Sequence, residues 1–251
     1  WVYTQRYARH AGEGRPVGLP DGLTSVVVVG QAMDHDLVDT VPSALSSAAV
    51  GLGYSKDALV LLATAQWLRN LGYQAVPSLN DTALAIPLAI QAGLGEYGRH
   101  GLVITPEFGP RVRFGKIFTD APLDHDAPVE FGVSAFCEVC RRCTDACPPK
   151  AIPDGEPSPV KLNRSAIGGV RKWSVDGEKC FSYWTQIVTD CMICMRVCPY
   201  NKDFSRWRHR VGRRLAATGL RRLMLRLNDR LGYGERLRPR AWWAGATRRR
   251  T

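Results

Sequence analysis

The chain has 251 residues, of which 45% are hydrophobic and 23% are charged, and its formal net charge is +11. This length and composition exclude a disordered chain and allow one large domain or two modest ones. The positive charge gathers at the end of the chain, because residues 206–251 contain fifteen arginines and two acidic residues. Such a region suits nucleic acid, a membrane surface or an acidic partner. No apolar run approaches the length of about eighteen residues that predicts a transmembrane segment.

The chain begins at Trp1, with neither a methionine nor a charged-then-apolar leader before it. We therefore expect a fragment or a processed form, from which any export signal would have been lost. A cytoplasmic location is favoured, and the periplasmic face of a membrane is the alternative.

The first part of the chain predicts alternating strands and helices. Thr24–Met33 is a β-branched apolar run that indicates a buried strand. Ser55 is expected to cap a helix that ends at Gly72, because apolar residues then recur along one helical face. These apolar residues are Ala58, Leu61, Leu62, Ala65 and Leu68.

Three further strands and one helix are expected after Gly72. Tyr73–Val76 can extend as a strand up to Pro77, and a helix can begin near Pro87. Residues 102–105 and Arg111–Thr119 are the next predicted strands. The resulting βαβαββ alternation is typical of a layered domain that contains both helices and strands.

We expect an α+β fold in three parts. Residues 1–130 would form the layered α/β domain, residues 131–205 contain every cysteine, and residues 206–251 would form a basic helical tail. In the tail, leucines near helical spacing predict an amphipathic helix that packs on the core with a solvated arginine face. These are Leu215, Leu220, Leu223, Leu227 and Leu231. A membrane surface, RNA or an acidic electron donor are the alternative partners of this tail.

The eight cysteines form two related motifs. The first is C-x2-C-x2-C-x3-C-P, and the second is a cysteine followed after ten residues by C-x2-C-x3-C-P. In such a motif, the closely spaced cysteines wrap one [4Fe–4S] cluster, and the cysteine before proline reaches the neighbouring cluster. We therefore predict that one cluster is bound by Cys137, Cys140, Cys143 and Cys198. The second cluster would be bound by Cys147, Cys180, Cys191 and Cys194.

Disulfides and zinc explain this pattern less well. C-x2-C pairs bridge poorly, and neither alternative gives the two Cys-Pro repeats a role. A free two-cluster ferredoxin needs only about 60 residues, and roughly 130 residues precede the first cysteine here. The preceding residues would therefore form a domain that accepts the electrons.

Residues 80–123, together with "GLGYS", "CFSYW" and "CMICMRVCPYNK", strongly resemble the core of the cobalamin-dependent reductive dehalogenases. The resemblance runs from about Val26 to the "GYGERLRPRAWW" near the C-terminus, and the N-terminal part of the family's catalytic unit is absent. It implies a nitroreductase-like corrinoid-binding domain with a ferredoxin-like insert, in an enzyme that replaces a carbon–halogen bond with a carbon–hydrogen bond. Two [4Fe–4S] clusters and a corrinoid bound base-off are the implied cofactors. An external low-potential donor, such as a ferredoxin, a flavodoxin or a membrane anchor, would supply the electrons.

The resemblance also implies catalytic residues. Tyr54 would donate the proton, Arg113 or Lys116 would supply the cation that lowers its pKa, and Asn80 would bind the tyrosine or the substrate. Arg113 and Lys116 point to opposite faces of a regular strand, so both could meet Tyr54 only if the strand bulges at Gly115. Taken singly, Tyr54 is more often a packing residue and Asn80 a turn residue.

A glycine-rich loop would lie along the corrinoid and its tail, because glycine lets the backbone approach a flat ligand closely. The expected corrinoid-contacting residues are Gly93, Gly95, Gly98, Arg99, His100, Gly101, Pro106, Glu107 and Phe108. The alternative is an ordinary turn-rich loop. No D-x-H-x-x-G motif occurs, which agrees with base-off binding.

Three other functions stay open. Epoxyqueuosine reductase has the same combination of corrinoid and two clusters, and the basic tail would suit its RNA substrate. A module for electron transfer alone and a fragment without catalytic activity are the others. We favour reductive dehalogenation, with a small organohalide as substrate and nucleic acid as an unlikely partner.

Overall fold

The computed structural model describes residues 18–80, 82–163 and 166–245, which form two compact units. Unit 1 comprises the described residues up to Gln31, Gly53–Leu94 and Arg113–Pro128. Unit 2 comprises Ala32–Leu52, Gly95–Val112 and the described residues from Val129 onward. This division differs from the three consecutive parts expected from the sequence, because residues 32–52, 95–112 and the tail all belong to the unit that contains the cysteines.

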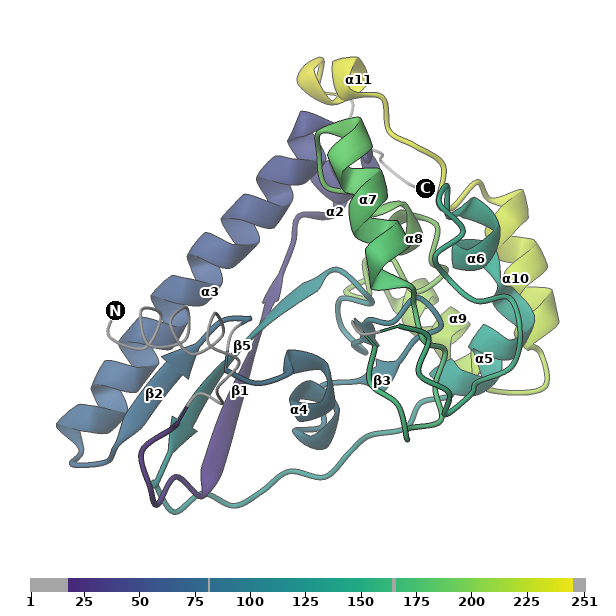
Figure 1. The fold of residues 1–251 in the computed structure, drawn as a ribbon. Helices are drawn as coiled ribbons and strands as arrows, with labels where there is room; N and C mark the ends of the chain where they lie inside the picture. The colour runs from purple at the N-terminus through teal and green to yellow at the C-terminus, as the bar shows by residue number, and fades with distance from the viewer. Residues whose placement is uncertain (1–17, 81, 164–165, 246–251) are drawn as a thin grey trace. The chain divides into compact units, whose positions relative to one another are not determined.

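A three-stranded sheet forms the centre of unit 1, with the strands in the order β1-β5-β2 (Figure 1). These strands are β1 (Ser25–Ala32), β5 (Val112–Thr119) and β2 (Ala75–Ser78). β2 pairs with β5 in antiparallel fashion, and the register runs from Ala75 opposite Thr119 to Ser78 opposite Lys116 without a skip. β2 therefore continues through Pro77, where we expected it to stop. Proline is tolerated here because β2 is an edge strand.

The helix α3 (Ala44–Asn70) begins eleven residues earlier than the predicted cap at Ser55, so that prediction is wrong. The side-chain hydroxyl of Ser43 instead accepts from the backbone N–H of Ser46, and that of Ser46 accepts from the N–H of Ser43, a reciprocal arrangement that begins the helix. The helix ends before Gly72, whose φ of +94° lies in the left-handed region that favours glycine. The next helix is α4 (Ala85–Gln91), two residues ahead of Pro87.

The core of unit 1 lies between α3 and the sheet. Leu61, Ala65 and Leu68 of α3 pack with Ala75 of β2 and Ile117 of β5. Leu62, which we expected on the same face, is exposed. By length and composition α3 is also apolar enough to cross a membrane, although Leu61, Ala65 and Leu68 lie in the protein core.

Unit 2 consists mainly of short helices around the cysteines. A two-stranded antiparallel ribbon pairs β3 (Glu96–Tyr97) with β4 (Val103–Ile104). The helices that precede and carry the cysteines are α2 (His35–Asp39), α5 (Val133–Cys140), α6 (Arg142–Ala146), α7 (Gly177–Ile187) and α8 (Ile193–Arg196). The tail contains α9 (Trp207–Ala216), α10 (Arg221–Arg230) and α11 (Pro239–Trp243).

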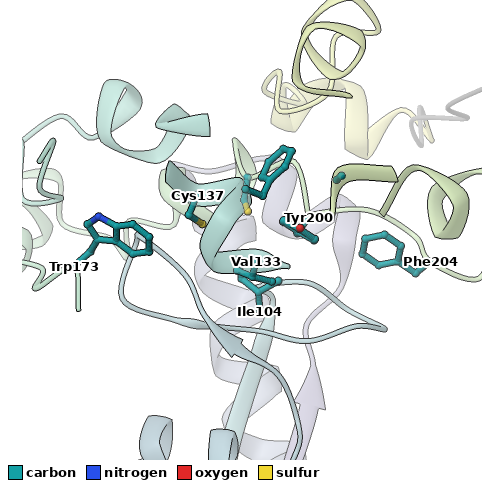
Figure 2. Close-up of a cluster of buried hydrophobic side chains, with 9 residues drawn as sticks. Ile104, Val133, Cys137, Trp173, Tyr200 and Phe204 are labelled. Carbon is teal, nitrogen blue, oxygen red and sulfur yellow. The ribbon is translucent and has the colours of Figure 1, made fainter. Parts of the chain in front are cut away.

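The main core of unit 2 packs around aromatic side chains (Figure 2). The rings of Phe136 and Tyr200 meet edge to face with centroids 5.3 Å apart, and Trp173, Phe204 and Val133 lie in the same cluster. Two of the cysteines, at positions 137 and 198, belong to this cluster. The core therefore holds part of the cysteine region in place.

The tail packs on this core by a different face from the predicted one. Met224 and Leu225 of α10 contact the core cluster, whereas Leu223 and Leu227 are exposed. The leucine spacing therefore predicted a helical segment correctly and its buried face incorrectly. Residues 217–220, between α9 and α10, are not helical. The leucines on the two sides of this break therefore do not lie along one continuous helical face.

Candidate functional site

Tyr54, Asn80 and Arg113 converge in unit 1. The side-chain amide of Asn80 donates a 2.6 Å hydrogen bond to the phenol oxygen of Tyr54. The guanidinium of Arg113 donates to the same oxygen at 3.4 Å and lies 4.7 Å from the centre of the tyrosine ring. Two donors on one oxygen, one of them cationic, stabilise negative charge on that oxygen. The arrangement can therefore support a tyrosine that gives up its proton.

Lys116 has a different position from Arg113. Its ammonium group is fully buried and donates to the backbone carbonyl of Leu79, the residue immediately before Asn80. Arg113 is thus the cation at Tyr54, and Lys116 fixes the segment that presents Asn80. The two cations thus have different surroundings, as expected of side chains on opposite faces of a regular strand.

Sequence reasoning missed Asp57, which lies one helical turn after Tyr54 on α3. Its side chain is fully buried, and neither carboxylate oxygen accepts a hydrogen bond from the described residues. Burial raises the pKa of Asp57 to about 6, and the charge of Lys116 limits the increase. The (i, i+3) spacing from Tyr54 was the available signal, but it belongs to no motif.

Gly115 allows α3 to approach β5 at this point. A Cβ atom at Gly115 would lie 2.3 Å from Leu61 Cδ1 and 2.7 Å from Asp57 Oδ1. The strand therefore needs glycine here for close packing of the helix, which is a different reason from the bulge that we expected to require it.

The eight cysteines, all in unit 2, have free thiols and belong to two groups. Four of them line one small cavity together with Phe136 and Tyr200: Cys137, Cys140, Cys143 and Cys198. Burial, reinforced in part by the neighbouring thiols, raises the pKa of Cys140 and Cys143 to about 12. Burial likewise raises the pKa of Cys137, to about 11. A cavity walled by four converging thiols fits a thiolate-ligated cluster, whose binding would displace the protons.

The second group gathers around Cys147, which ends α6. Burial is the main cause that raises the pKa of Cys180, Cys191 and Cys194, and in each case the nearby Cys147 adds to the increase. Cys147 Sγ also accepts a 3.3 Å hydrogen bond from the backbone N–H of Ala151. Cys147 is thus a neighbour of the second motif, although it belongs to the first motif in sequence. Among the described residues, no three His, Cys, Asp or Glu side chains lie close enough together to hold a single metal ion.

Arg99 and His100 of the glycine-rich loop point into the cysteine unit. Arg99 donates to the carbonyls of Cys137, Pro153 and Gly155 and lies 4.6 Å from the centre of the Trp173 ring. His100 lines the first cysteine cavity, and burial lowers its pKa to about 4. Both side chains therefore make contacts inside unit 2, instead of lying free for the corrinoid that we expected them to contact.

Four loop glycines are also explained by close packing within unit 2. A Cβ atom at Gly95 or Gly109 would lie 2.2 Å or 2.0 Å from a backbone carbonyl oxygen. A Cβ at Gly98 would meet His100 and Ile104, and one at Gly101 would meet Val175. The remaining expected corrinoid contacts are Gly93, whose φ is +69°, and the loop tip Pro106, Glu107 and Phe108. Glu107 and Phe108 are exposed, so this tip is available to a ligand.

Comparison with known proteins identifies the two parts of the chain. Residues 15–123 match the family of the reductive dehalogenase subunit, and residues 136–201 match the 4Fe-4S double cluster binding domain. The tetrachloroethene reductive dehalogenase of Desulfitobacterium hafniense is 45% identical over 193 residues, which cover 75% of this chain and 35% of that protein. The tetrachloroethene reductive dehalogenase of Sulfurospirillum multivorans is 36% identical over 229 residues, which cover 90% of this chain and 46% of that protein.

A solved structure agrees with these relatives. The catabolic reductive dehalogenase NpRdhA in complex with 3-bromo-4-hydroxybenzoic acid has a TM-score of 0.75 at 27% identity, over 84% of this chain and 30% of that chain. Epoxyqueuosine reductase of Lactococcus garvieae is more distant, at 30% identity over 142 residues, which cover 50% of this chain and 34% of that protein.

The mixed α+β fold and the match to the 4Fe-4S double cluster binding domain place the chain in the class of iron–sulfur proteins. Over its matched residues, the chain is similar to the reductive dehalogenases. It spans 35% to 46% of the length of the two tetrachloroethene dehalogenases described above.

Proposed function

We propose that this chain takes part in the reductive dehalogenation of a small organohalide. In this reaction the organohalide takes up two electrons and one proton, and it leaves as the dehalogenated product and a halide ion. The observation that carries the proposal is that one chain combines the Tyr54 cluster with two groups of four thiols. Similarity to the tetrachloroethene reductive dehalogenases supports the same reaction class.

The thiol groups would hold the two [4Fe–4S] clusters. The first cluster would take the four cysteines that line the cavity beside Tyr200, and the second would take the four that gather around Cys147. In this assignment Cys147 joins the two motifs, because its neighbours in space belong to the second one. An external low-potential donor, such as a ferredoxin, a flavodoxin or a membrane anchor, would reduce the clusters.

In unit 2, the corrinoid would contact the loop tip Pro106, Glu107 and Phe108. When bound, it supplies a cobalt ion that is reduced at low potential and acts on the carbon–halogen bond. Base-off binding is part of the proposal, and the absence of a D-x-H-x-x-G motif supports it. Arg99 and His100 are better explained by their contacts in the cysteine unit.

Tyr54 would supply the proton to carbon. The hydroxyl proton leaves the phenol oxygen, and the donors on Arg113 and Asn80 stabilise the charge that remains there. Lys116 would act as a positioning residue, because it holds the carbonyl of Leu79 and so places Asn80.

Halide release tests this function. The chain would be reconstituted with iron, sulfide and cobalamin, reduced chemically without oxygen, and supplied with a panel of haloalkenes and haloaromatics. We expect halide release that depends on both the corrinoid and the reductant. A protein that retains corrinoid and both clusters, releases no halide from any compound and instead reduces the epoxyqueuosine base of tRNA would contradict the proposal. A protein with clusters and no retained corrinoid would favour electron transfer alone.

A further inference from the structure

Two residues that line the first cysteine cavity each carry a buried hydrogen-bond donor without a described partner. The hydroxyl of Tyr200 and Nε2 of His100 make no hydrogen bond with the described residues. Both side chains are at least 95% buried, and both line the cavity that the first four thiols share. Buried donors without a partner are uncommon in native proteins, and such groups often face an ion or a ligand.

The position of Tyr200 is fixed by packing. Its ring is held edge-on by Phe136 and by Phe131, with centroids 5.3 Å and 6.1 Å away. Gly109 lies against its carbonyl, where a Cβ atom would approach the oxygen to 2.0 Å. Cys137 and Cys198 belong to the same buried cluster of side chains as Tyr200 and line the same cavity. Tyr200 is therefore held beside the proposed cluster ligands by its surroundings.

The tautomer of His100 follows from its one hydrogen bond. The backbone N–H of Leu102 donates to Nδ1 of His100 at 3.3 Å, so Nδ1 is the acceptor. In a neutral imidazole the proton then lies on Nε2, which becomes a donor. Nε2 has no described partner, in the same cavity as the Tyr200 hydroxyl.

We propose that Tyr200 and His100 donate hydrogen bonds to sulfur atoms of the first cluster and so raise its reduction potential. Each added electron makes the cluster sulfurs more negative, and a donor to sulfur stabilises the reduced form more than the oxidised form. Both donors keep their protons during the electron transfer. The inference depends on the proposed assignment of Cys137, Cys140, Cys143 and Cys198 to one cluster.

Redox titration followed by electron paramagnetic resonance tests the inference on the full chain with both clusters reconstituted. Tyr200→Phe removes one oxygen atom and leaves the packed ring in place. We expect one of the two cluster couples to move to lower potential and the other to stay unchanged. Tyr97→Phe is the matched control, since the Tyr97 hydroxyl is paired with the carbonyl of Trp173 at 3.0 Å. Neither couple should move in this control.

His100 has its own pair of variants. His100→Phe should lower the potential of the same couple, and His100→Gln, which keeps an N–H donor, should restore part of the shift. Electron–nuclear double resonance in D2O should detect an exchangeable proton at the reduced first cluster that is lost in Tyr200→Phe. If His100→Phe does not assemble the cluster, Tyr200→Phe and the proton measurement decide the question.

Unchanged couples in both Tyr200→Phe and His100→Phe, with no change in the exchangeable proton signals, would overturn the inference. This failure is distinct from failure of the proposed function. If the wild-type chain does not assemble two clusters, the cluster assignment itself fails before any variant is compared.

Discussion

At the scale of single residues, the phenol oxygen of Tyr54 is the best-defined chemical group in unit 1. Asn80 and Arg113 both donate to it, and they come from the segment after β2 and from β5. The sequence left the choice between Arg113 and Lys116 open, because both are cations near one glycine. Only the tertiary structure distinguishes them, since it places one cation over the ring and the other on the carbonyl of Leu79.

Tyr54→Phe removes the proposed proton donor. We expect halide release to fall by about 100-fold or more, because a positioned acid typically accelerates a reaction by 10²–10⁴-fold. Cluster content should stay unchanged. The control is Tyr73→Phe, because Tyr73 packs against the core of the same unit. Full activity in Tyr54→Phe would show that the proton comes from another group.

Asp57→Asn tests the buried carboxylate through stability. The folded-state pKa of about 6 lies above the ordinary value of 3.8, so the stability contributed by the protonated carboxyl is complete below about pH 4. That contribution is lost as the pH rises through about 6, and Lys116 is the neighbouring charge that acts on this carboxyl. This increase in the pKa of Asp57 changes the free energy of unfolding by roughly 3 kcal/mol at most.

Asp57→Asn should therefore unfold at a higher denaturant concentration than the wild type at pH 7.5. At pH 4 the two proteins should unfold at similar concentrations. Denaturation curves across this range provide the measurement. Asp124→Asn is the control, because Asp124 is exposed in the same unit. Equal stability differences at pH 7.5 and pH 4 would show that Asp57 is not the titrating group.

At the scale of elements, α3 shows where local patterns mislead. The predicted helix began at Ser55, after Gly51 and Gly53, because Ser55 was expected to cap it. The helix instead begins at Ala44 and passes through both glycines. Packing overrides their low helix propensity, since the apolar residues beyond them bury in the core of unit 1. The strands β1 and β5 were easier to predict, because their β-branched and apolar runs are local signals.

Gly115→Ala tests the packing between α3 and β5. The added methyl group would contact the Leu61 and Asp57 side chains at less than 3 Å, so the helix or these side chains must move. Overpacking of this kind costs about 1–3 kcal/mol, and we expect the free energy of unfolding to fall by that amount. Gly51→Ala is the control within the same helix, where an added Cβ meets nothing within 4 Å. Stability equal to that of wild type in Gly115→Ala would contradict the close packing.

At the scale of the whole molecule, the cysteine motifs were the most informative part of the sequence. Ligand spacing is a local property, so the motif identified a double-cluster domain that the family comparison confirms. The division into units could not be predicted in the same way. Residues 32–52 and 95–112 join the cysteine unit through contacts with residues distant in sequence. Asp57 and the unpartnered donors at Tyr200 and His100 also depend on tertiary contacts and match no motif.

The central structural claim is that the two motifs cross at Cys147. Electron paramagnetic resonance of the reduced, reconstituted chain tests it most directly, with three variants: Cys147→Ala, Cys194→Ala and Cys140→Ala. We predict that Cys147→Ala and Cys194→Ala lose the same cluster signal. Both should keep the signal that Cys140→Ala loses. If Cys147→Ala instead loses the same signal as Cys140→Ala and keeps the one that Cys194→Ala loses, the crossed assignment is wrong.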